Sequence, residues 1–138
     1  MNKHYGFRFL VFSNVISAVA FFALASVVPV ANAQSLDVPV MEIADGNLDT
    51  CAYGKVDGLK ADGDGFLAVR SGPGTQYQKL DELRNGDDVW LFNWQGDWIG
   101  IVYDNQELNC SPISADREVP YEGKKGWVHK NWIKLLAG

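Results

Sequence analysis

From residue 51 onward, apolar residues occur in short runs separated by Gly, Asn, Asp and Pro. Short runs rich in valine, isoleucine and aromatic residues, bounded by such turn residues, are typical of β-strands. We expect strands at 51–59, 66–70, 78–83, 89–94, 98–103, 126–128 and 134–136, with a single 3-10 turn at 131–133. The pattern predicts an all-β fold, a small barrel of five to seven short strands, with no helix of useful length.

The strand expected at 89–94 carries different side chains on its two faces. Successive residues of a strand point in opposite directions, so Val89 and Leu91 should face the core while Trp90, Phe92 and Trp94 share the other face. This row is more exposed aromatic surface than a lone domain normally shows. It is either a binding surface or a face that another segment of the chain covers. The other tryptophans are Trp98 and Trp127, which we expect in the core, and Trp132.

Residues 1–33 have the pattern of a secretory signal peptide. Two basic residues precede a nearly continuous apolar run at 10–30, and Ala31 and Ala33 supply small side chains before Gln34. The run is also long enough to span a bilayer, so a membrane anchor is the alternative. Because polar residues interrupt the run and no basic cluster follows it, we expect cleavage, a secreted or periplasmic protein, and no stable membrane anchor afterwards.

Residues 34–50 are polar, contain proline and show no sustained periodicity. Such a segment is typical of a linker, and we expect at most one short strand within it, at 40–43. The folded domain should therefore comprise residues 51–138.

The charge balance restricts the classes of partner. All 17 acidic residues but only 10 of the 12 lysines and arginines follow residue 33, so the exported chain carries a net charge of 10 − 17 = −7. Nucleic acids and anionic lipids require a basic face, so we expect no nucleic acid as a partner. A neutral glycan, a basic peptide or a protein is compatible with this charge.

Cys51 and Cys110 are the only cysteines. In a chain bound for an oxidising compartment, an even count favours one disulfide over a reactive thiol or half of a metal site. Closing a loop of about 60 residues would stabilise the fold by about 4 kcal/mol in the chain-entropy model.

Catalytic and metal-binding motifs have little support. After the signal peptide the only histidine is His129, with no serine or cysteine nucleophile near it in sequence, whereas hydrolytic triads need a nucleophile and a base to converge. The acidic run at 62–65 is similar to a calcium loop, but Lys60 and Ser71 occupy two positions where an EF-hand needs acidic ligands. A turn explains this run better. We expect a non-enzyme with no catalytic residue, metal or cofactor.

Residues 67–77 read LAVRSGPGTQY, a strand that breaks into a rigid loop, because Pro73 fixes its φ while Gly72 and Gly74 tolerate positive φ. This run resembles the signature of the bacterial Src-homology-3 (SH3b) domains, with Ala68 where many members carry Asn. Further matching segments are Asn85-Gly86-Asp87, Gly96-Asp97-Trp98, Gly126-Trp127-Val128 and Trp132-Ile133. The resemblance covers about residues 51–137 and implies an SH3-like barrel.

Residues 104–125 depart from the family pattern, which usually has a tight turn there. Loops of this length inside compact domains are often functional or disordered. Because Cys110 lies within this insert, a bridge to Cys51 would attach the insert to the first strand. The insert is also the segment that could cover the aromatic row.

The resemblance implies a binding module, because the family most often recognises cell-wall peptidoglycan or peptides. We therefore expect an exported module that binds peptidoglycan or its peptides. The alternative is a periplasmic protein–protein interaction module, such as an inhibitor or an immunity-type protein, that uses the acidic surface and the insert. An enzyme is a third hypothesis, disfavoured by the missing nucleophile and base.

The resemblance also implies where the ligand binds. In the family the recognition face is commonly framed by aromatic side chains and by the loop that follows the second strand. On this sequence the ligand-binding residues would be Tyr77, Trp90, Trp94 and Trp132, with Ser71 and Gly74 contributing backbone groups.

The exported protein should begin at Gln34, because the peptidase requires the small side chains of Ala31 and Ala33 before the cleaved bond. Intact mass spectrometry of the secreted or periplasmic protein checks this prediction. Ala33→Gly should be processed normally, whereas Ala33→Leu should accumulate as the precursor. A wild-type protein that keeps Met1 and stays in the membrane fraction would contradict the prediction.

Overall fold

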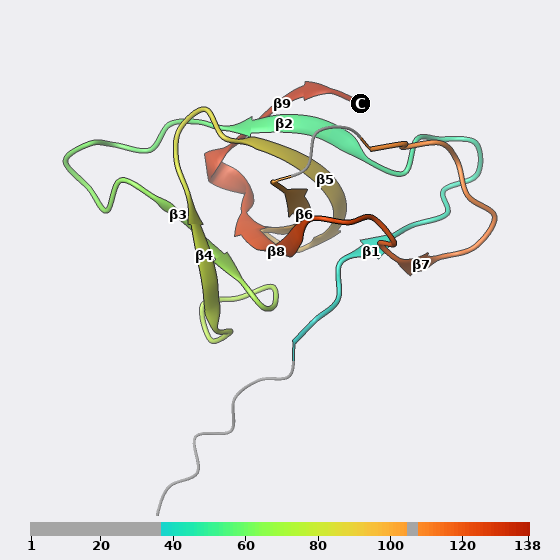
Figure 1. The fold of residues 1–138 in the computed structure, drawn as a ribbon, viewed down its shortest axis with the longest axis horizontal. Helices are drawn as coiled ribbons and strands as arrows, with labels where there is room; N and C mark the ends of the chain where they lie inside the picture. Colours follow the sequence, from blue (N-terminus) through green and yellow to red (C-terminus); the bar gives the residue numbers. More distant parts are fainter. Residues whose placement is uncertain (1–36, 105–107) are drawn as a thin grey trace, which may run out of the picture. The chain divides into compact units, whose positions relative to one another are not determined.

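The structure, a computed structural model, describes residues 37–104 and 108–138. In this part of the chain it contains nine strands and one 3-10 turn, arranged in two sheets (Figure 1). None of the described segments forms a helix long and apolar enough to cross a membrane. The signal peptide expected at 1–33 lies outside the described residues.

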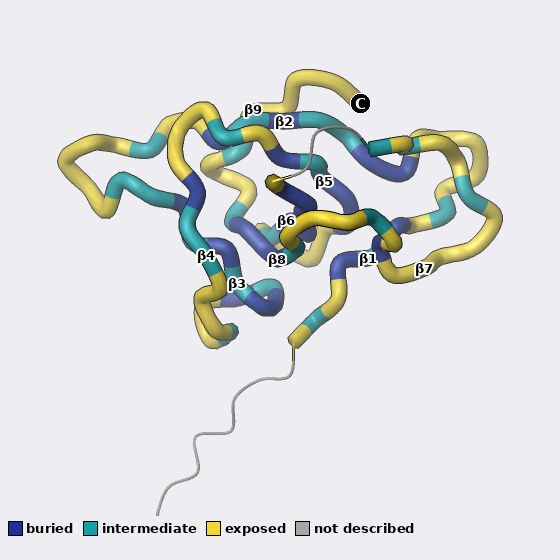
Figure 2. The backbone as a smooth tube through the Cα atoms, viewed as in Figure 1, coloured by how far each residue is buried: buried dark blue, intermediate teal, exposed yellow. Residues whose placement is uncertain are grey.

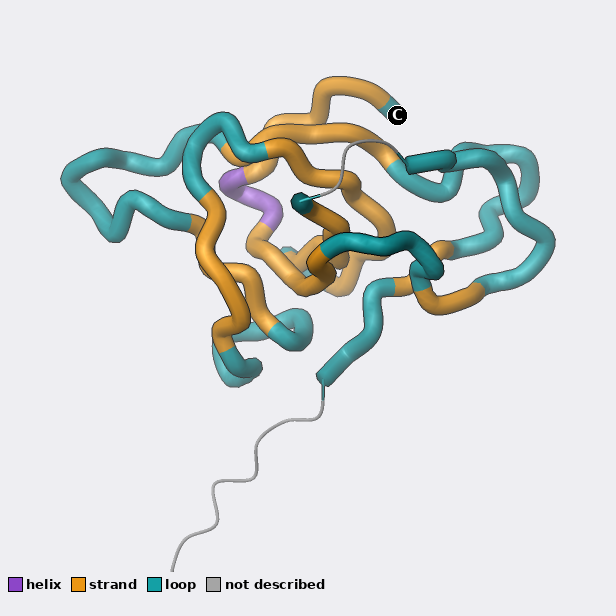
Figure 3. Tube along the Cα trace, in the orientation of Figure 1, coloured by secondary structure: helices purple, strands orange, loops and turns teal. Residues whose placement is uncertain are grey.

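The larger sheet has seven antiparallel strands in the order β4-β3-β8-β6-β5-β2-β9. Its strands are β2 (Ala52–Val56), β3 (Leu67–Arg70), β4 (Lys79–Leu83), β5 (Asp88–Gln95), β6 (Trp98–Tyr103), β8 (Lys124–His129) and β9 (Ile133–Ala137). The 3-10 turn η1 (Lys130–Trp132) joins β8 to β9 (Figure 3). The predictions of an all-β fold and one 3-10 turn are confirmed. The barrel is open rather than closed, since the edge strands β4 and β9 do not pair with each other.

The smaller sheet pairs two segments that are far apart in sequence, β1 (Met41–Glu42) and β7 (Arg117–Glu118) (Figure 1). The expected short strand near residues 40–43 is thus present. Val38 continues the attachment, because its N–H donates to Ser71 O at 2.7 Å and its carbonyl accepts from Trp127 Nε1 at 2.7 Å. Over residues 37–50, the lead-in predicted as a linker is therefore part of the domain.

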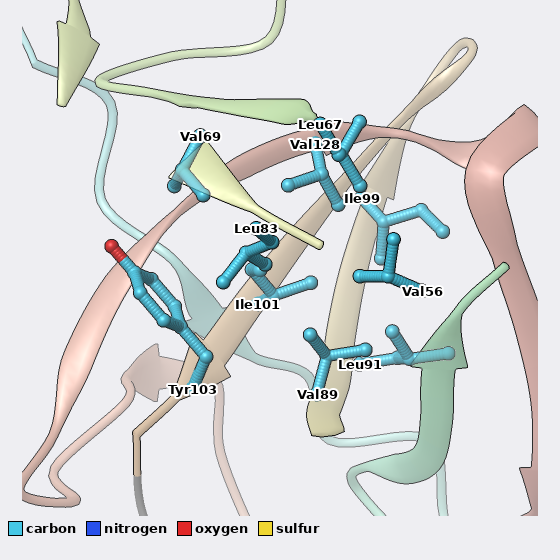
Figure 4. Close-up of a cluster of buried hydrophobic side chains, with 10 residues drawn as sticks. All are labelled: Val56, Leu67, Val69, Leu83, Val89, Leu91, Ile99, Ile101, Tyr103 and Val128. Carbon is cyan, nitrogen blue, oxygen red and sulfur yellow. The ribbon is translucent and has the colours of Figure 1, made fainter. Parts of the chain in front are cut away.

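The main core lies on one face of the seven-stranded sheet. It contains ten buried residues contributed by six strands, and Figure 4 shows their side chains converging. Val89 and Leu91 are among them, as the alternation of β5 predicts. The Tyr103 hydroxyl lies at the margin, where it donates to Asp81 Oδ2 at 3.2 Å. Burial, and next the charge of Asp81, raise the pKa of Tyr103.

A second buried cluster covers the opposite face of β5, β6 and β8. Val102 and Trp127 lie in this cluster, whereas their sequence neighbours Ile101 and Val128 lie in the main core. The three strands are therefore buried on both faces, and Figure 2 shows them largely in the buried class, in contrast to β9. The covering residues come from the lead-in and the insert, namely Val38, Val40, Leu108, Cys110, Val119 and Tyr121.

Gly100 of β6 lets the lead-in approach this second face closely. A Cβ at Gly100 would lie 2.5 Å from Asn93 Oδ1 and 2.9 Å from Val40 Cγ1, so any side chain there would clash. Asn93 Oδ1 in turn accepts a hydrogen bond from Met41 N at 3.0 Å. The buried Asn93 and the missing side chain of Gly100 thus fix β1 in place over the sheet.

The disulfide predicted between Cys51 and Cys110 is present, with a Cα–Cα distance of 5.0 Å and a sequence separation of 59 residues. Beside it, Thr50 N donates to Cys110 O at 2.7 Å. The bridge ties the insert to the start of β2, and it is compatible with an oxidising, extracytoplasmic compartment.

Glu42 is fully buried at the junction of β1 and the insert. A buried carboxylate is costly unless donors surround it. Here Thr50 Oγ1 donates to Oε1 at 2.7 Å, Arg117 Nε donates to Oε2 at 2.6 Å, and the Tyr121 hydroxyl lies 3.3 Å from Oε1. Burial, followed by the charge of Glu42, raises the pKa of Tyr121. The carboxylate therefore connects three segments of the cover.

Replacing both cysteines, Cys51→Ser with Cys110→Ser, should lower the free energy of unfolding by about 2–5 kcal/mol, because the unfolded chain regains the freedom of a long loop. Thermal unfolding followed by circular dichroism measures this loss. Hydrogen exchange should rise first in β1 and β7, which the bridge holds in place, and later in β5 and β6. An unchanged melting temperature would show that the cover is held without the bridge.

Candidate functional site

A groove of about 470 Å³ lies where the β3–β4 hairpin meets η1. Its lining combines the aromatic rings of Phe66, Trp98, His129 and Trp132 with the charged residues Asp64, Arg70 and Lys79. We call it the aromatic groove. Its residues come from separate parts of the chain, which the pairing of β3 with β8 and of β8 with β6 brings together.

Trp98 and His129 form one wall of the aromatic groove. They are direct partners in the β6–β8 register, and their ring centroids lie 5.5 Å apart with the planes at 77°. His129 Nδ1 accepts a hydrogen bond from Asn131 N at 3.3 Å as the N-cap of η1. In the neutral imidazole the proton is therefore on Nε2, which is left as a hydrogen-bond donor.

Trp132 is held in place through its backbone. Its carbonyl accepts from Asp57 N at 3.0 Å, and η1 begins where Lys130 N donates to Asp97 O at 2.9 Å. The Lys130 ammonium also lies 2.8 Å from Asp97 Oδ1, and this hydrogen bond lowers the pKa of Asp97. The Trp132 side chain is 36% exposed. A fixed backbone under a partly exposed ring suits ligand contact, since little freedom remains to be lost on binding.

Cationic groups border the aromatic groove on the hairpin side. Lys79 Nζ lies 4.8 Å from the centroid of the Phe66 ring, a cation–π distance. Arg70 Nη1 donates to Thr75 O at 3.2 Å and to Tyr77 O at 2.9 Å, which leaves Nη2 and Nε as donors. The groove can thus contact flat or apolar groups with its rings and a carboxylate with the Arg70 guanidinium.

Of the predicted ligand residues, Trp132 lines the aromatic groove, whereas the loop after β3 serves the fold. Ser71 and Gly74 are buried, and the N–H and C=O groups of both are already hydrogen bonded within the protein. Tyr77 is half-buried, with its ring so close to Gly72 that a Cβ there would lie 2.3 Å from Cδ1. These backbone groups therefore already serve the fold, and a contribution of Ser71 and Gly74 to ligand binding stays a prediction.

Trp90, Phe92 and Trp94 of β5, which were expected on one exposed face, differ in their burial. A register shift between Leu91 and Trp94 interrupts the alternation that the sequence predicted. Phe92 is buried under the cover, with its ring 6.2 Å from that of Tyr121. Trp90 is half-buried against the second cluster and lies 5.2 Å from the Tyr53 ring, while Trp94 is 56% exposed. Neither Trp90 nor Trp94 reaches the aromatic groove.

Sequence reasoning missed most of the aromatic groove. Trp98 was expected in the core, yet it is only half-buried and lines the groove as well as contacting the second cluster. The register that pairs Trp98 with His129 and brings Phe66 near them is a property of the sheet. The SH3b-like segments contained a partial signal, since Gly96-Asp97-Trp98 and Trp132-Ile133 both belong to the resemblance.

Comparison with known proteins assigns neither a family nor a function to this chain. The sequence matches no family model and no curated protein, and the fold matches no solved structure. Within residues 37–104 and 108–138, no group of three or more His, Cys, Asp or Glu side chains is placed to hold a metal ion. The aromatic groove is the candidate site because of its converging rings and the cations beside them.

Trp90→Ala and Trp94→Ala should differ in stability, because one ring is half-buried and the other is mostly exposed. Trp90→Ala should cost about 2 kcal/mol, roughly half the cost of truncating a core tryptophan, and lower the melting temperature by about 10 °C. Trp94→Ala should stay within about 0.5 kcal/mol of the wild type. Thermal melts of both variants test this difference, and equal losses would contradict it.

Proposed function

We propose that this protein is an exported, non-catalytic binding module of the SH3b type. Its aromatic groove binds cell-wall peptidoglycan through the stem peptide. The observation that carries this proposal is the convergence of Phe66, Trp98 and Trp132 in one groove that has cations at its border.

The chemistry of the groove supports such a ligand. Aromatic faces contact the apolar faces of sugar rings and of peptide side chains. Stem peptides carry carboxylates, and Arg70 offers charged donors beside the rings, whereas the Lys79 ammonium is already paired with Glu82 Oε1 at 2.8 Å. A ligand with apolar groups next to a carboxylate therefore matches the rings and the Arg70 guanidinium of the groove.

The sequence supports the same class of protein and its location. The LAVRSGPGTQY run and the later matching segments resemble the SH3b family, and the all-β fold with one 3-10 turn agrees with that resemblance. The expected signal peptide and the Cys51–Cys110 bridge support a secreted or periplasmic location. Peptidoglycan is accessible from that side of the membrane.

Cosedimentation with purified peptidoglycan sacculi tests the proposal. The wild type should be retained, and Trp132→Ala should weaken retention about thirtyfold, the effect of losing an aromatic anchor worth about 2 kcal/mol. Trp94→Ala is the matched control, because it removes an exposed tryptophan outside the groove. Melting temperatures of both variants confirm that they are folded.

Wild-type protein that stays in the supernatant would overturn the proposal. If the protein instead captured an envelope protein in a Trp132-dependent way, the groove would serve a protein–protein interaction module of the inhibitor or immunity type. Release of soluble fragments from sacculi by the purified protein would contradict the non-catalytic part of the proposal.

A further inference from the structure

A second groove lies at the ends of β5 and β9, and it shares no lining residue with the aromatic groove. It consists of two adjoining cavities of about 580 and 550 Å³, which have Asp49, Thr50, Phe92 and Trp94 in common. We call it the Trp94 groove. Its walls are the turn at residues 45–50, the end of β5, and the end of β9.

Large apolar side chains are exposed around the Trp94 groove. Leu48 is 62% exposed, Trp94 56% and Leu135 60%, and Ile43 also reaches the surface. Single exposed apolar residues are ordinary, but a contiguous group beside a cavity is typical of an interaction surface. The second cluster is built from neighbouring residues such as Phe92 and Val40, and Leu48, Trp94 and Leu135 are not part of it.

The charge of the Trp94 groove is unbalanced. Asp45 and Asp49 belong to its lining, and within the described part of the chain neither carboxylate has a hydrogen bond or an ion pair. The described lining residues include no Lys, Arg or His. Elsewhere on the surface the chain supplies such partners itself, in the pairs Asp81–Lys124, Asp88–Lys55 and Asp97–Lys130.

The turn that carries the two carboxylates is held in place. Leu48 N donates to Asp45 O at 3.2 Å, and Thr50 N donates to Cys110 O at 2.7 Å next to the disulfide. Thr50 Oγ1 also donates to the buried Glu42. A preformed turn loses little conformational freedom when a partner binds, which favours affinity.

We propose that the Trp94 groove is a second interaction surface, which binds a partner-protein segment with a lysine or arginine beside aliphatic residues. The cation lies over the Trp94 ring and near Asp45 and Asp49, and the aliphatic side chains contact Leu48 and Leu135. Cation–π contact and two uncompensated carboxylates select a basic segment over an acidic one. The net charge of −7 for the exported chain, 10 − 17, opposes a second copy as the occupant.

Selection from a displayed library of random 12-residue peptides tests this surface and does not depend on the ligand of the aromatic groove. Enriched peptides should place Lys or Arg beside Leu, Ile or Val. The best peptide, measured by fluorescence anisotropy, should lose at least tenfold in affinity with Trp94→Ala and with the double variant Asp45→Asn, Asp49→Asn. Asp62→Asn, which neutralises an exposed acid outside both grooves, and Trp132→Ala should bind it like the wild type.

Each of the other results overturns the proposal. No enriched motif, or a neutral or acidic one, would exclude selection by Asp45 and Asp49. Binding that survives Trp94→Ala but fails with Trp132→Ala would assign the peptide to the aromatic groove. A dimer in sedimentation equilibrium that Leu135→Asp dissolves would make a second copy of this chain the occupant.

Discussion

The structure depends on one packing constraint, which is that strands β5, β6 and β8 are apolar on both faces. Ile101 and Val128 point into the main core while Val102 and Trp127 point to the other side, so a single curled sheet cannot bury them all. The second face needs its own cover. The lead-in and the insert supply that cover, and it is fastened by the Cys51–Cys110 bridge and by the buried carboxylate of Glu42.

The cover decides which aromatic residues remain available. It buries Phe92, half-buries Trp90, and ends before Trp94, which is left beside a second groove. The aromatic groove is lined instead by residues of the β3–β4 region and by Trp98, His129 and Trp132, and no described residue of the lead-in or the insert belongs to its lining. The chain therefore has two separate tryptophan surfaces that differ in charge: Arg70 and Lys79 together with Asp64 beside Trp132, and, among the described residues, carboxylates alone beside Trp94.

The insert illustrates why a long loop need not be a ligand site. Residues of the insert pair with β1, contact Phe92 and neutralise Glu42. Removing these contacts would expose Trp127 and a buried carboxylate at the same time, which is a large cost for a small domain. Over its described residues, the insert thus covers the second cluster, with Val119 buried and most of its polar residues exposed.

Local pattern in the sequence was sufficient for the cysteine pairing, the 3-10 turn and the strands other than β7, since alternation, turn residues and an even cysteine count are short-range or countable signals. The strand β7 lies in the insert, where no such pattern predicted it. The expected strand at 98–103 coincides with β6. The tertiary structure alone decided that residues 37–50 belong to the core, that a register shift separates Trp94 from Phe92, and that Trp98 meets His129. Those outcomes depend on which segments pair across long sequence separations. The pairing is selected by the total burial of all strands together, and a local sequence pattern does not encode that total.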